Sequence, residues 1–214
     1  MSVPLVIFDV DGVLVDTVAA NVEAYQFACR RTGLSVPEAD HIRPLLGRSA
    51  EEMAVALGCP PGEVREFVET YAGPRYEAVV ARGVLTFPGV PELLAALADR
   101  GVRLTAWTTG RAVLQEAVLR RAGIRAWIEF LHAPGATDYP KPDPRGLDEI
   151  VARFPGAAPR YLVDDRGEML AGADHIGARR IFAAYGLGAP PLSPPDGILH
   201  APADLLALIS PLKS

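Results

Sequence analysis

Strand-like and helix-like patterns alternate along the chain beyond residue 88, and this alternation most constrains the fold. Short apolar runs predict strands at 102–107, 128–131, 161–163 and 180–183. Apolar residues at helical spacing predict helices at 91–100, 111–122, 144–154, 167–176 and 204–209. Repeated strand–helix units build a parallel sheet with helices on both faces, so the sequence predicts an α/β fold.

The segment before residue 88 has a different character. The continuous apolar run Leu5–Phe8 predicts a strand that is buried on both faces and joins the same sheet. After it, residues 17–85 are nearly all helical in pattern, with helices expected at 17–33, 49–57 and 63–81. We therefore expect an α/β core formed by residues 1–16 and 87–214, with a helical domain, residues 17–86, inserted after the first strand.

Composition excludes several classes of protein. A chain of 214 residues, 50% of them hydrophobic, buries a sufficient core without disulfides. No apolar run reaches the length of a membrane-spanning helix. A net charge of −5 disfavours a nucleic-acid partner. The two cysteines, Cys29 and Cys59, are too few for a disulfide framework and predict free thiols. We expect a cytoplasmic protein, a monomer or a homodimer.

Polar side chains follow three of the predicted strands. They are Asp9 and Asp11 after the first strand, Thr108-Thr109-Gly110-Arg111 after the second, and Asp164-Asp165 after the strand at 161–163. Ligands bind beyond the carboxyl ends of strands in such a sheet, so these groups share one rim. Lys141, one of only two lysines, precedes a helix in the same half of the sheet. Clustered carboxylates with a lysine and a hydroxyl suit Mg²⁺ and phosphoryl transfer.

Each of these segments also has a purely structural explanation. Asp11-Gly12 is typical of a hairpin turn, and Asp164-Asp165 is typical of a helix cap. Thr108-Thr109-Gly110 fits an ordinary strand-to-helix turn, and Lys141-Pro142-Asp143-Pro144 fits a rigid turn that starts a helix. Their order and combination favour an active site.

In this order, four segments resemble the four motifs of the haloacid dehalogenase superfamily: Asp9–Thr17, Thr108, Lys141–Pro144 and Leu162–Asp165. The resemblance covers nearly the whole chain, and the insertion at 17–86 is similar to the small helical cap of that family. It implies a Rossmann-like core and a hydrolase similar to phosphoglycolate phosphatases and β-phosphoglucomutase.

The resemblance also implies roles for individual residues. Asp9 would be the nucleophile that forms an aspartyl-phosphate, and Asp11 the general acid and base. The Thr108 hydroxyl would bind the phosphoryl group, assisted by the backbone N–H of Thr109. Lys141 would neutralise the phosphoryl group and the nucleophile.

The metal implied by the resemblance is Mg²⁺, held by Asp9, the backbone carbonyl of Asp11, and Asp164. This sequence departs from the common pattern at Glu168, where an aspartate is usual. Either Glu168 or Asp165 would then support the metal. Asp11 favours phosphate chemistry over dehalogenation, because displacing a halide needs no acid at this position.

Substrate selection is expected from two places. Arg48, in the loop 43–49 that leads into a helix, lies in a segment similar to the specificity loop of capped members. Gly110 and Arg111, just past the second motif, are further candidates. The expected partner is a small phosphorylated metabolite, hydrolysed as a phosphate monoester.

Four alternatives remain open. A phosphosugar mutase or a pyrophosphatase would share every core residue. A non-catalytic phosphate-binding regulator would share the fold alone. A response-regulator-like receiver also has an acidic rim and a lysine, although the helical insertion disfavours it.

Overall fold

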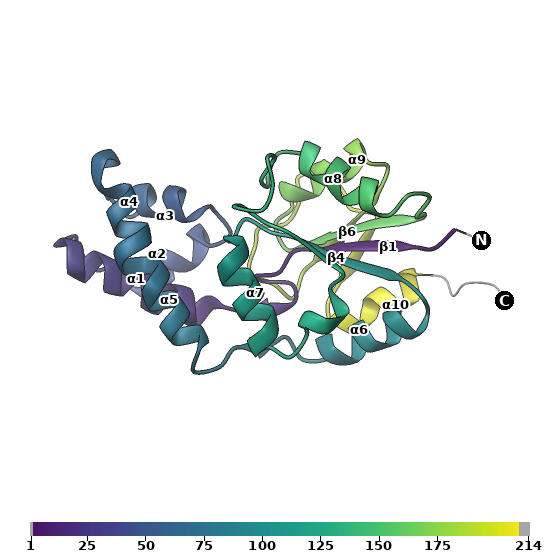
Figure 1. Cartoon of the computed structure of the whole chain (residues 1–214), viewed down its shortest axis with the longest axis horizontal. Coiled ribbons are helices and arrows are strands. Elements are labelled where there is room, and N and C mark those ends of the chain that lie inside the picture. Colours follow the sequence, from purple (N-terminus) through teal and green to yellow (C-terminus); the bar gives the residue numbers. More distant parts are fainter. Residues whose placement is uncertain (1, 210–214) are drawn as a thin grey trace.

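The computed structural model describes residues 2–209, and its centre is a six-stranded parallel sheet (Figure 1). The strands are β1 (Leu5–Phe8), β4 (Arg103–Trp107), β5 (Phe130–His132), β6 (Arg160–Asp164), β7 (Arg179–Ala183) and β8 (Gly197–Leu199). They lie in the order β5-β4-β1-β6-β7-β8, and every neighbouring pair is parallel. The predicted α/β fold with a Rossmann-like core is confirmed.

Helices cover both faces of this sheet (Figure 1). One face packs against α6 (Val90–Asp99), α7 (Ala112–Arg121) and α10 (Leu205–Leu208), and the other against α8 (Arg145–Arg153) and α9 (Gly172–His175). In β1, Val6 and Phe8 face the first layer and Leu5 and Ile7 the second. All four are essentially inaccessible, which explains the continuous apolar run in the sequence.

The residues between β2 (Val15–Asp16) and β3 (Leu85–Thr86) form a separate helical lobe (Figure 1). Its main elements are α1 (Val18–Thr32), α2 (Ala39–Ile42), α3 (Ala50–Ala56), α4 (Val64–Glu66) and α5 (Gly73–Val80). The lobe has its own apolar cluster, which includes Tyr25, Ile42, Met53 and Phe67. Two short strands, β2 (Val15–Asp16) and β3 (Leu85–Thr86), pair antiparallel where the chain enters and leaves it. The division at residues 17 and 86 stays a prediction.

The helix predicted at 49–57 is confirmed as α3, and Ser49 and Glu52 exchange hydrogen bonds in a capping box at its start. The helical stretch predicted at 63–81 is confirmed for Val64–Val80, but its geometry changes part-way along. A π-helical turn, Phe67–Ala72, separates α4 from α5. Pro74 explains the break, since its ring has no N–H and clashes with the carbonyl a turn earlier.

Three further elements differ from the prediction. The strand expected at 128–131 begins later, because a 3-10 turn at Arg125–Trp127 precedes β5. The helix expected at 167–176 is a 3-10 turn, Met169–Ala171, followed by the short α9. β8 was missed at the end of the Pro/Gly-rich loop, since three residues give too short a pattern to detect.

The strand order determines where a ligand crevice opens at the edge of the sheet. From β1 the chain crosses to β4 and β5 on one side of the sheet, then returns past β1 to β6, β7 and β8 on the other. Such a reversal opens a crevice beyond the carboxyl ends of the central strands. Asp9 directly follows β1, Thr108 directly follows β4, and Asp164 ends β6.

Substitution of Leu94 tests the packing of α6 on the sheet. Leu94 is inaccessible to solvent. We expect Leu94→Ala to lower the free energy of unfolding by about 2–5 kcal/mol, because a cavity remains in the core. The matched control is Leu85→Ala, since Leu85 is 77% exposed and should change stability by less than about 0.5 kcal/mol. Urea denaturation measures both; equal losses would contradict the packing described.

Candidate active site

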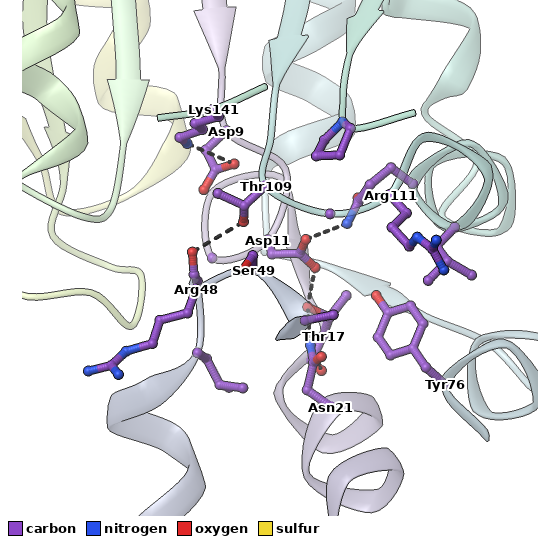
Figure 2. Close-up of a pocket in the computed structure, with 18 of the residues that line it drawn as sticks. Asp9, Asp11, Thr17, Asn21, Arg48, Ser49, Tyr76, Thr109, Arg111 and Lys141 are labelled. Carbon is purple, nitrogen blue, oxygen red and sulfur yellow. Dashed lines mark hydrogen bonds and ion pairs between the residues drawn. The ribbon is translucent and has the colours of Figure 1, made fainter. Parts of the chain in front are cut away.

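A cavity of about 430 Å³ lies between the rim of the sheet and the helical lobe. Its floor is formed by groups that follow the strands, including Asp9, Lys141 and Asp165, and its far wall by residues of α1, α5 and the loop before α3. Figure 2 shows side chains from both sides turned toward this space. The volume suits a small organic ligand.

Lys141 connects two of the carboxylates. Its Nζ lies 2.6 Å from Oδ2 of Asp164 and 3.2 Å from Oδ1 of Asp9, and it also donates to the Trp107 carbonyl at 3.3 Å. All three charged side chains are buried. The ammonium ion is thus held at the junction of β1, β4 and β6, where the sequence predicted a charge-neutralising role.

Burial and mutual repulsion shift the titration of these groups. Burial raises the pKa of Asp9 well above its ordinary value; Lys141 opposes this, and Asp164 and Asp165 add to it. Burial raises the pKa of Asp165 to about 6, with a further contribution from Asp164. For Lys141, burial disfavours the charge, but Asp164 and Asp9 outweigh it and raise the pKa. One ammonium ion thus faces more carboxylate than it can neutralise.

The excess negative charge fits a divalent cation. Among residues 2–209, the acids close enough to share an ion are Asp9, Asp164 and Asp165, whose ligand oxygens lie within 4.8 Å of one another. Oxygen ligands of this kind match Mg²⁺. Asp165 therefore joins the cluster. Glu168 does not, because its carboxylate pairs with Arg166 and is largely exposed at a neighbouring hollow.

Asp11 is held by two partners on either side. The Thr17 hydroxyl donates to its Oδ1, and Nε2 of Gln115 donates to its Oδ2 at 2.6 Å (Figure 2). Thr17 occupies the N-cap position of α1, but its side chain does not cap the helix; Asp16 accepts from the Val18 N–H instead. Burial raises the pKa of Asp11, although both hydrogen bonds and Lys141 oppose the shift. A carboxyl with a raised pKa suits a general acid.

The second motif places its two hydroxyls differently. The Thr108 side chain is buried and its Oγ1 accepts from the N–H of Gly110, which orders the turn after β4. Thr109, Gly110 and Arg111 line the cavity, whereas Thr108 does not. The Thr109 hydroxyl donates to the Gly47 carbonyl of the lobe at 3.1 Å.

The comparison with known families agrees with this geometry. A family model described as haloacid dehalogenase-like hydrolase matches residues 6–181. The chain belongs to the haloacid dehalogenase-like hydrolase family. We accordingly call the helical lobe the cap.

Individual relatives also support membership of this family. The chain is 31% identical over 189 residues to a probable phosphatase named IndB from Dickeya dadantii, covering 86% of this chain and 82% of that protein. It is 26% identical to a phosphoglycolate phosphatase from Caulobacter vibrioides, covering 92% and 87%. The crystal structure of a predicted phosphoglycolate phosphatase from Haemophilus somnus superposes with a TM-score of 0.87 at 21% identity, covering 97% and 98%. The predicted family and enzyme class, a hydrolase with phosphatases as relatives, are confirmed.

No helix within residues 2–209 has both the length and the apolar character needed to cross a bilayer.

The two cysteines are free thiols, and both are buried in the cap.

The cap supplies one predicted residue and several that the sequence did not suggest. Arg48 lines the rim of the cavity, but Figure 2 shows its guanidinium directed away from Asp9 and Lys141. Arg111 lies opposite, 3.4 Å from Glu69 of the cap. Polar cavity residues that the sequence analysis missed include Asn21, Tyr25, Glu51 and Tyr76 in the cap, and Gln115 in α7.

A cradle of glycines around Asp165 was also missed. Oδ2 of Asp165 accepts from the N–H groups of Leu187 and Gly188 at 2.8 and 2.9 Å. Gly12 adopts a φ of +87°, and a Cβ there would lie 2.2 Å from the same oxygen. The Asp11-Gly12 turn is therefore a tight loop against Asp165, with the Val15 N–H bonded to the Val10 carbonyl, and it does not join two long hairpin strands.

The pKa of Asp165 predicts how Mg²⁺ stabilisation depends on pH. Its folded-state pKa, about 6, lies above its ordinary 3.8, so in the metal-free protein its contribution to stability is lost as the pH rises through about 6. The ionised carboxylate is what binds a cation. We expect Mg²⁺ to raise the Tm much more at pH 7.5 than at pH 5.

Thermal denaturation with and without Mg²⁺ at constant ionic strength measures this difference. Asp165→Asn is the control, because its side-chain oxygen still accepts from the 187–188 backbone but carries no charge. We expect a smaller Mg²⁺ shift for this variant at pH 7.5. Equal shifts at both pH values in the wild-type protein would contradict the assignment.

Proposed function

We propose that the chain is a Mg²⁺-dependent phosphatase that hydrolyses small phosphate monoesters through an aspartyl-phosphate on Asp9. The observation that carries the proposal is the buried Lys141 ammonium ion beside Asp9, at the base of a cavity that Asp11 also faces. A nucleophile, a counter-charge and a carboxyl with a raised pKa thus meet in one small cavity.

Mg²⁺ would be held by Asp9, Asp164 and Asp165, together with the backbone carbonyl of Asp11. When bound, it supplies positive charge against the phosphoryl oxygens and the nucleophile. Glu168 faces away and has no part in this set.

The chain's own residues perform the remaining steps. A carboxylate oxygen of Asp9 attacks phosphorus, the bond from phosphorus to the ester oxygen breaks, and Asp11 gives its proton to the departing alcohol. Asp11 then accepts a proton from water as that water attacks the phosphorus of the aspartyl-phosphate. Inorganic phosphate leaves, and the Asp9 carboxylate is restored. Lys141 remains charged throughout and offsets the charge on the phosphoryl oxygens.

The second motif and the cap loop bind the substrate in this proposal. The backbone N–H of Thr109 donates to the phosphoryl group in this proposal, and the Gly110 N–H donates to Thr108 and orders the turn beside the cavity. Arg111 and Arg48 flank the entrance. The preferred substrates are small, because the cap covers the site and encloses a limited volume.

Phosphate release from a panel of phosphate esters and pyrophosphate tests the proposal. We expect release with Mg²⁺ and none with EDTA. Asp9→Asn should lower kcat by at least about a thousandfold, because the amide is not a nucleophile, and circular dichroism should show an unchanged fold. Wild-type activity in this variant would overturn the nucleophile. Isomerisation of a sugar phosphate without phosphate release would indicate a mutase.

Gln115 offers a second test, as a positioning residue for Asp11. Gln115→Leu removes the donor to Oδ2 of Asp11. We expect kcat/KM for an alkyl phosphate to fall by about tenfold or more, and to fall less for p-nitrophenyl phosphate, whose leaving group needs no proton. The loss of a donor to the carboxylate should also raise the pKa of Asp11 and move the alkaline limb of the pH profile upward.

The matched control is Gln26→Leu, because Gln26 lies in α1 and donates to the Pro37 carbonyl within the cap. This variant should leave the ratio of the two substrates unchanged. A uniform loss for both substrates in Gln115→Leu, with an unshifted pH profile, would exclude a positioning role.

A further inference from the structure

The cap wall of the cavity is built from hydroxyl, amide and carboxylate groups on an apolar background. The polar groups belong to Asn21 and Tyr25 of α1, Glu51 of α3 and Tyr76 of α5. Apolar contact comes from Ala24, Val68 and Ala72 of the cap, and from Leu114 of α7 in the core. Asn21 and Tyr76 appear in Figure 2 on the side of Asp11 away from Lys141, where the alcohol part of a phosphate ester would lie.

Tyr76 is the most informative of these residues. Its side chain is 7% exposed and lines the cavity, yet its hydroxyl has no hydrogen-bond partner among residues 2–209. Burial raises the pKa of Tyr76 well above its ordinary value, and the nearby Asp11 carboxylate adds to the shift. The Thr17 hydroxyl lies near enough to oppose the shift, although it does not reach normal hydrogen-bond geometry with the phenol. The phenol is therefore neutral, and it is a buried donor that a ligand oxygen would satisfy.

The neighbouring groups are acceptors. The side-chain nitrogen of Asn21 donates to the carbonyl and hydroxyl oxygens of Thr17 at 3.0 and 3.3 Å. Its amide oxygen is then left to accept from a ligand. The Glu51 carboxylate lies close enough to Tyr25 to raise the pKa of that phenol, after the larger effect of burial. Acceptors beside a donor match the hydroxyl group, which both donates and accepts.

Three of the four cationic side chains that line the cavity contact other groups of the protein. Lys141 binds Asp9 and Asp164, and Arg166 binds the Gly47 carbonyl and Glu168. At the rim, Arg111 contacts Glu69, and the guanidinium of Arg48, the fourth, points away from Asp9 and Lys141 (Figure 2). A carboxylate in the alcohol part of the substrate would share the cavity with the Glu51 carboxylate.

We propose that the alcohol part of the substrate is neutral and hydroxylated, like that of a sugar or polyol phosphate, and that Tyr76, Asn21 and Glu51 bind its hydroxyl groups. The inference rests on the proposed phosphatase function and specifies its substrate class. Phosphorylated carboxylic acids are then disfavoured, because the Glu51 carboxylate repels them.

Matched pairs of esters test the proposal. Glycerol 3-phosphate is compared with 3-phosphoglycerate, and 2-hydroxyethyl phosphate with 2-phosphoglycolate, so that each pair differs mainly by hydroxymethyl against carboxylate. We expect kcat/KM to be at least about tenfold higher for the neutral member of each pair. A preference for the carboxylates would overturn the proposal.

Three variants connect this preference to the wall. Tyr76→Phe should lower the ratio of kcat/KM for glycerol 3-phosphate to that for p-nitrophenyl phosphate by about tenfold, because the aryl ester has no hydroxyl to bind. Glu51→Gln should raise kcat/KM for 3-phosphoglycerate by removing a like charge. The control is Tyr71→Phe, on a cap tyrosine whose hydroxyl donates to Glu66. It should leave both the ratio for the first two esters and kcat/KM for 3-phosphoglycerate unchanged. An unchanged ratio in Tyr76→Phe would overturn the assignment.

Failure of the proposed function is distinguishable from failure of this inference. If no ester releases phosphate in the presence of Mg²⁺, the phosphatase function fails. Calorimetric binding of the same pairs to Asp9→Asn with Mg²⁺ then still decides the substrate class. Tighter binding of the neutral members would support the inference, and equal or weaker binding would overturn it.

Discussion

The buried ammonium ion of Lys141 is the interaction on which the rest of the site depends. It lies 2.6 Å from Asp164 and 3.2 Å from Asp9, and so joins the ends of β6 and β1 at the reversal of the strand order. Removing either partner of such a pair leaves an uncompensated buried charge. The chain carries 21 basic residues, and only Lys141 and Lys213 are lysines. A compact ammonium fits between two carboxylates and a carbonyl, whereas a planar guanidinium would need a wider space.

Two polar contacts between cap and core share one backbone group. The carbonyl of Gly47 accepts from the Thr109 hydroxyl and from the Arg166 guanidinium, so two turns of the core rim hold the same point of the cap loop. Gly47 adopts a φ of +90°, a backbone conformation that residues with a side chain rarely adopt, which explains why glycine stands there. Thr109 and Arg166 follow β4 and β6, the strands that also place Thr108 and Asp164. Cap position and catalytic geometry therefore depend on the same two turns.

The sequence predicted what depends on local pattern and missed what depends on tertiary packing. β1 and Asp9 were predictable because an apolar run followed by an acid is a contiguous signal, and the rarity of lysine marked Lys141. Gln115 was not predictable, since its position in α7 carries no pattern and its role arises only when α7 packs beside the Asp11 loop. The glycine cradle of Asp165 depends on the turn after β7, which reads as an ordinary loop in the sequence. The sequence left Glu168 and Asp165 as alternatives for supporting the metal; Glu168 pairs with Arg166, whereas Asp165 lies in the cluster with Asp9 and Asp164.

The floor and the cap wall of the cavity carry different chemical groups, which fit different parts of a phosphate ester. The floor concentrates carboxylates, one ammonium ion and the cation they require, a combination suited to phosphoryl groups of any ester. Selectivity must then come from the groups that face the alcohol, and these are supplied by α1, α3 and α5 of the cap. The Tyr76 hydroxyl, which lacks a protein partner within residues 2–209, is the kind of buried donor that a protein retains for a ligand. Because the cap is encoded as one contiguous insertion, its wall can change without disturbing Lys141 and its carboxylates, and the same core can serve different alcohols.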